Sequence, residues 1–178
     1  MRRRLGFTLI ESMATVVILG ALGSTSSLLI VTSVNSLAEA AARLQMHGEL
    51  SIAMDRIIRE IRDIPLDSAA VGVAPDINTA DDANLQWDDT VGAAQIITSG
   101  STITLAVKGN AANVLLTDVT QLDFDFDDED DAALGALPRT GASCDAIRRV
   151  KVLISLTRTG WVEELEATVY IRSCMVGS

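Results

Sequence analysis

The chain has 178 residues, of which 24 are acidic, 14 are basic and only 3% are aromatic, and its formal net charge is −10. Because the phosphates of nucleic acids are bound mainly by lysine and arginine, this balance argues against DNA or RNA as a partner. The few aromatic side chains also argue against a sugar-binding surface built from stacked rings.

The N-terminal region has the composition of a membrane-spanning helix. Residues 7–34 contain a single charged side chain, Glu11. A helix of that length is about 42 Å long, and the hydrocarbon core of a bilayer is about 30 Å thick. Arg2, Arg3 and Arg4 precede the segment, and basic flanks stay on the cytoplasmic side. We therefore expect one membrane span, with the rest of the chain outside the cytoplasm.

The position of Glu11 needs an explanation, because a carboxylate in a membrane-spanning helix costs about 2.5–3.5 kcal/mol on insertion scales. Four features occur in order: a basic leader, a small residue at Gly6, an aromatic residue at Phe7, and Glu11 within the apolar run. This arrangement resembles the processing site of type IV prepilins and pseudopilins. The resemblance implies cleavage by a prepilin peptidase between Gly6 and Phe7, N-methylation of Phe7, and an assembly role for Glu11.

The same resemblance implies a function. We expect a minor pilin-like structural subunit in the inner membrane that is incorporated into a type IV pilus or primes it. Its partners would be other pilins or pseudopilins, the inner-membrane assembly platform and the peptidase. A minor pseudopilin of a type II secretion system is the alternative within the family. Many members carry a proline partway along the apolar helix, and this chain has none before Pro65.

Two other interpretations of the N-terminus remain open. An ordinary secretory signal would use residues 13–23 as its apolar region and be cut near Gly23 or Ser24, which leaves Glu11 without a purpose. A membrane-anchored extracytoplasmic binding module that does not polymerise would keep the leader. The N-terminus of the mature protein distinguishes all three.

The helix is expected to continue beyond the membrane. Apolar residues recur at helical spacing, first at Leu37, Ala41 and Leu44, and then at Leu50, Met54, Ile57 and Ile61. Pro65 restricts the residue before it and should end the helix. We predict four segments: a leader at 1–6, a transmembrane or filament-core helix at 7–36, its amphipathic continuation at 37–64, and a β head domain at 65–178.

The head domain shows β patterns without intervening helices, which predicts an antiparallel sheet and an α+β fold. Short apolar or β-branched runs occur at 85–87, 94–98, 102–107, 114–116 and 119–126, and residues 65–84 read as a loop. Two later runs, at 149–156 and 164–171, form the clearest hairpin, with a turn around residues 158–160. Matching their apolar faces pairs Val152 with Ala167.

Cys144 and Cys174 both fall in the part expected to be exported, where an even number of cysteines favours a disulfide. Each is 15 residues from the predicted hairpin tip, so the hairpin should bring them near one another. The strand register places Cys144 opposite Met175, one residue away from Cys174. Two free buried thiols are the alternative.

Seven acidic residues lie between positions 123 and 131, and calcium is bound by such oxygen ligands. Asp123, Asp125 and Asp127 are weak candidates for calcium ligands, because the loop pattern of the EF-hand is absent. A solvated strand end is the simpler interpretation, and we expect no cofactor.

The chain offers no combination of residues that indicates catalysis. His47 is its only histidine, and no nucleophile–base set, zinc motif or phosphate-binding loop is present. We therefore expect a protein that is not an enzyme.

Overall fold

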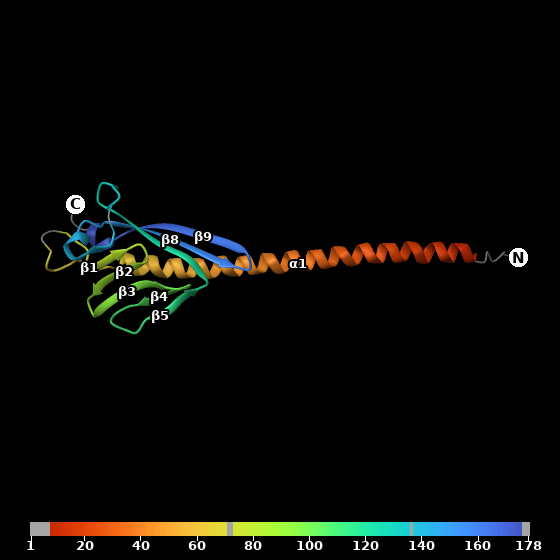
Figure 1. Cartoon of the computed structure of the whole chain (residues 1–178), viewed down its shortest axis with the longest axis horizontal. Coiled ribbons are helices and arrows are strands. Elements are labelled where there is room, and N and C mark those ends of the chain that lie inside the picture. The colour runs from red at the N-terminus through yellow and green to blue at the C-terminus, as the bar shows by residue number, and fades with distance from the viewer. Residues whose placement is uncertain (1–7, 71–72, 136, 176–178) are drawn as a thin grey trace. The chain divides into compact units, whose positions relative to one another are not determined.

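The computed structural model describes residues 8–70, 73–135 and 137–175. Its first element is helix α1 (Leu9–Arg62). The rest consists of strands and two short 3-10 helices: β1 (Ile77–Asp81), β2 (Asn84–Asp89), β3 (Gly92–Ser99), β4 (Thr102–Ala106), β5 (Asn113–Thr117), β6 (Val119–Asp127), β7 (Arg139–Thr140), η1 (Gly141–Cys144), β8 (Arg149–Arg158), β9 (Trp161–Tyr170) and η2 (Arg172–Met175). A long N-terminal helix packed on antiparallel strands confirms the predicted α+β fold (Figure 1).

Helix α1 runs for 54 residues without interruption, and it ends just before Pro65, as predicted. The chain divides into two compact units, Met1–Leu44 and Gln45–Ser178, so α1 contributes to both. In the first unit, every described residue is exposed. Leu37 and Leu44, which we expected on a packed face, are 71% and 73% exposed.

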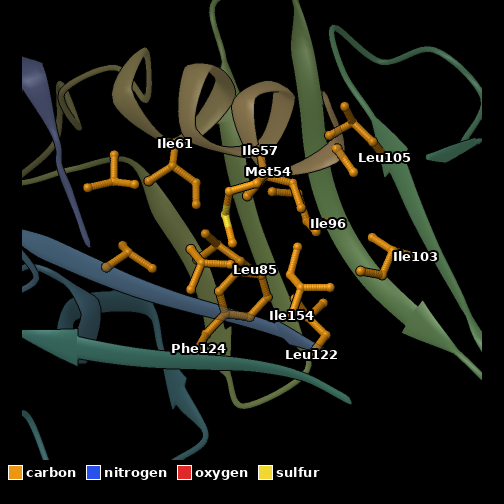
Figure 2. Packing of buried hydrophobic residues seen from close by; sticks show 14 of the residues in the cluster. Met54, Ile57, Ile61, Leu85, Ile96, Ile103, Leu105, Leu122, Phe124 and Ile154 are labelled. Atoms are coloured by element: carbon orange, nitrogen blue, oxygen red, sulfur yellow. The ribbon is translucent and has the colours of Figure 1, made fainter. Parts of the chain in front are cut away.

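In the second unit, one stripe of α1 forms part of the core. Its buried residues follow the 3.6-residue period of a helix: Met46, Leu50, Ala53, Met54, Ile57 and Ile61. Figure 2 shows Met54, Ile57 and Ile61 pointing from the helix toward Leu85 and Phe124 on the strands. Four of the positions that were predicted from periodicity, Leu50, Met54, Ile57 and Ile61, are thus buried here.

The strands form two antiparallel sheets, where the sequence predicted one. The larger has the order β5-β4-β3-β2-β1-β7, and the smaller has the order β6-β8-β9. The inner faces of both sheets contribute to one continuous hydrophobic cluster together with α1. Val152 pairs with Ala167 in the β8–β9 hairpin, which confirms the predicted register.

Strand β1 corrects the prediction that residues 65–84 form a loop. Its sequence, INTAD, has little apolar alternation, but Ile77 and Ala80 are buried. The strand forms because β2 pairs along one edge of it and β7 along the other. Partners distant in sequence, not local propensity, determine this element.

Asp76 lies just before β1, in a segment held by backbone hydrogen bonds. Its backbone N–H donates to the carbonyl of Pro65 at 2.9 Å, and its carbonyl accepts from the N–H of Asp88 at 3.0 Å. Burial raises the pKa of the Asp76 carboxyl, and the nearby charges of Asp67 and Asp88 raise it further. The ionised carboxylate therefore disfavours folding at neutral pH.

The substitution Asp76→Asn should raise the midpoint of thermal unfolding at pH 7. A carboxyl whose folded pKa is raised stabilises the fold below its unfolded pKa and loses that contribution as pH rises through the folded pKa. The difference in unfolding midpoint between the variant and the wild type should therefore shrink as the pH is lowered below the folded pKa of Asp76. Thermal unfolding followed from pH 3 to pH 8 measures this, with the exposed Asp55→Asn on α1 as the control. A variant that gains nothing at pH 7 would contradict the assignment.

Candidate processing and assembly segment

The predicted cleavage site, Gly6 and Phe7, and the basic residues before it lie outside the described residues. The structure of this segment therefore begins at Thr8, immediately before α1.

Thr8 caps the N-terminus of α1. The backbone N–H of Glu11 donates to Thr8 Oγ1 at 3.4 Å and to the carbonyl of Thr8 at 3.1 Å. Thr8-Leu9-Ile10-Glu11 has the spacing of a capping box, which is a local signal in the sequence. A carboxylate in the first turn also interacts favourably with the positive end of the helix dipole. Glu11 thus has a local structural role besides any role in assembly.

Glu11 is exposed, and within residues 8–70, 73–135 and 137–175 it forms no ion pair. It lies four positions after Phe7, which would carry the new terminal ammonium if the leader were removed. A carboxylate here can serve as an acceptor for a cation supplied from outside the described chain.

The exposed surface of α1 carries a single charged side chain, Glu11, as far as residue 38, and α1 is the helix among the described residues that is long and apolar enough to cross a membrane. Several of its hydroxyl groups donate to backbone carbonyls within the helix: Thr15 to Glu11, Ser24 to Ala21 and Thr32 to Leu28, over 2.7–3.0 Å. Such internal bonds allow serine and threonine to sit in an apolar environment. This segment fits membrane anchoring.

The acidic residues of β6 do not converge on a cation site. Asp127 is 1% exposed, and its carboxylate forms an ion pair with Lys151 Nζ at 3.1 Å and lies 3.7 Å from Arg149 Nη2. Asp123 and Asp125 lie on the outer face of the strand, opposite the buried Phe124 and Phe126. In the described ranges, no group of three or more His, Cys, Asp or Glu side chains is placed to hold a metal ion.

Arg158 links α1 to the strands. Its guanidinium donates to Glu49 at 2.6 Å and to Asp118 at 2.7 Å. The Gln45 side chain and Arg158 hold the pKa of the Glu49 carboxyl below its usual value through hydrogen bonds. His47, on the same turn of α1, is 59% exposed and lies 4.0 Å from Glu163.

The structure does not contain the expected bond between Cys144 and Cys174, since both are free thiols. The paired part of the β8–β9 hairpin extends only from Arg149 to Tyr170 on its open side. Both cysteines lie beyond it in 3-10 helices, so the register of the hairpin does not determine their separation. Burial raises the pKa of each thiol and so suppresses the reactive thiolate.

Comparison with known families identifies the N-terminal segment. Residues 1–26 match the family model of the prokaryotic N-terminal methylation motif. No curated protein matches the chain. The match covers the leader, Gly6, Phe7, Glu11 and the first part of the apolar helix. It supports a relationship of the chain to the type IV pilin and pseudopilin family.

Proposed function

We propose that this chain, of the type IV pilin and pseudopilin family by its N-terminal motif, is a minor pilin that joins or primes a type IV pilus. The observation that carries the proposal is the methylation motif at residues 1–26 together with a helix that is exposed from residue 9 to residue 44 and has one charged side chain, Glu11, before Glu39. Such a surface requires lipid or neighbouring helices around it. A structural subunit uses both environments in turn.

In the membrane, the precursor would keep its arginines in the cytoplasm and its head domain outside. A prepilin peptidase would remove residues 1–6, and Phe7 would become the methylated N-terminus. The assembly platform would then move the subunit out of the inner membrane, where the apolar surface of α1 exchanges acyl chains for the helices of other pilins.

Glu11 would determine the axial position of the incoming subunit. Its carboxylate has no cationic partner within the described residues, and a buried unpaired charge is strongly unfavourable. The ammonium group of Phe7 on an adjacent pilin is a partner of the required charge. Pairing the two removes this penalty at only one register of the helices.

Removal of the leader is tested with Gly6→Val. A branched side chain at the position before the cut should exclude the chain from a peptidase site that accepts glycine, so that the variant keeps residues 1–6. In cells that contain a prepilin peptidase, gel mobility and intact mass should show a shorter wild-type chain and a full-length variant.

Gly20→Val is the matched control, because a Cβ at Gly20 meets nothing within 4 Å and the residue lies well inside α1. It should be processed like the wild type. Processing of Gly6→Val to the same N-terminus, or a wild-type chain that stays full length, would refute the proposed cleavage site.

A further inference from the structure

A hollow without charged residues lies against the six-stranded sheet of the second unit. Its volume is about 240 Å³, and four carboxamide side chains line it: Asn78, Gln86, Gln95 and Asn110. Alanine, glycine and tryptophan provide the rest of the lining. The absence of charge is notable in a chain in which 21% of the residues are charged.

The register of the sheet assembles this site from three strands and a turn. Gln86 on β2 is directly opposite Gln95 on β3, and Gln95 is opposite Ala106 on β4. Ala93 and Ala106, on the same face of the sheet as Gln95, are small and so leave room for a ligand. Asn78 lies at the register shift in β1, between Ile77 and Thr79.

The turn that carries Asn110 is fixed in place. The N–H of Gly109 donates to the carbonyl of Ala93 at 3.0 Å, and the N–H of Asn110 donates to Val107 at 3.0 Å. Gly109 has a φ of +68°, and a Cβ added to Gly92 would come within 3.2 Å of the Gly109 Cα. Two glycines therefore allow the β4–β5 turn to pack on the β2–β3 turn, and this wall of the hollow is preformed.

The four carboxamides have unused hydrogen-bonding capacity. Among the residues that the structure describes, none of these side chains has a hydrogen-bond partner in the protein. Each has an oxygen that accepts and an NH₂ group that donates two hydrogens. The hollow therefore presents donors and acceptors close together, with no net charge.

This chemistry selects the class of ligand. A charged ligand would lose hydration and find no opposite charge in the lining, and an apolar ligand would leave the carboxamides without partners. Sugars are commonly bound against an exposed aromatic face, but Trp87, the aromatic residue of the lining, is only 2% exposed. The N–H and C=O groups of a peptide match the carboxamides, and a small side chain fits beside the alanines.

We propose that this hollow binds an uncharged peptide segment that carries a small side chain, such as an exposed loop of a partner protein. The site belongs to the second unit and uses no residue of the N-terminal motif. A site that binds no peptide would therefore leave the proposed pilin function untouched. In turn, failure of the proposed pilin function would leave this site untouched.

The test uses the full chain in detergent micelles, with ¹⁵N in the side chains of asparagine and glutamine. The probe is the blocked peptide acetyl-alanyl-seryl-alanine amide. We expect saturable shifts of the four side-chain NH₂ signals, and weaker binding when glutamate or lysine replaces the central serine. Absent shifts, equal binding of the charged peptides, or shifts caused only by an N-acetylglucosamine trimer would overturn the proposal.

A pair of variants adds a second criterion. Ala93 is exposed, so Ala93→Leu should fold normally while its side chain fills the hollow, and binding should weaken about tenfold, or about 1.4 kcal/mol. Gln121→Leu removes an exposed carboxamide from β6 of the other sheet and should leave the affinity unchanged. Unchanged affinity in Ala93→Leu, or an equal loss in both variants, would contradict the assignment.

Discussion

Replacing Glu11 with alanine should leave the protein in the membrane but reduce its incorporation into pili at least tenfold. Removing one partner of a buried ion pair costs about 3–5 kcal/mol, and each 1.4 kcal/mol changes an equilibrium about tenfold. Insertion should not suffer, because loss of a carboxylate makes the helix more apolar. The measurement compares the amount of the chain in sheared pili with the amount in membranes.

Glu39→Ala is the matched control. Glu39 is also an exposed carboxylate on α1, but it lies beyond the apolar run, so its removal changes the net charge equally without removing the proposed partner of Phe7. It should assemble like the wild type. Normal incorporation of Glu11→Ala would contradict the proposed role in register, and a loss in both variants would attribute the effect to charge in general.

Replacing Ile57 with alanine should destabilise the second unit by about 2–5 kcal/mol, the usual cost of removing a buried isoleucine side chain down to Cβ. Ile57 is fully buried where α1 meets both sheets (Figure 2). Since domains of this size are typically stable by about 5–15 kcal/mol, the loss is a large fraction of the total. Urea unfolding of the full chain in micelles, followed by the fluorescence of the buried Trp87, measures it.

Ile52→Ala makes the same chemical change five residues earlier on the same helix. Ile52 is 71% exposed, so this variant should unfold within about 0.5 kcal/mol of the wild type. Similar losses in both variants would show that helix propensity, not packing against the sheets, controls stability. A negligible loss in Ile57→Ala would contradict the packing described for α1.

Features encoded by neighbouring residues could be predicted from the sequence. The apolar run, the Glu11 motif, the end of α1 before Pro65 and the buried stripe from Leu50 to Ile61 depend on local spacing. The alternating apolar residues of β8 and β9 gave the pairing of Val152 with Ala167 for the same reason. The capping spacing of Thr8 and Glu11 was equally local and could have been recognised.

Features that depend on distant partners could not be predicted. Strand β1 has little alternation and exists because β2 and β7 pair with it. The expected proximity of Cys144 and Cys174 assumed that the hairpin register continues to both residues, but 3-10 helices replace the strands there. The polar hollow arises from the cross-strand pair Gln86–Gln95 and from a turn fixed by two glycines, which no single segment specifies.

The N-terminus of the mature protein tests the central claim most directly. Mass spectrometry of the chain purified from cells that contain a prepilin peptidase should identify N-methylated Phe7 as the first residue, with residues 1–6 absent. A chain that still begins at Met1 in those cells, or one that begins near Ser24, would contradict the account.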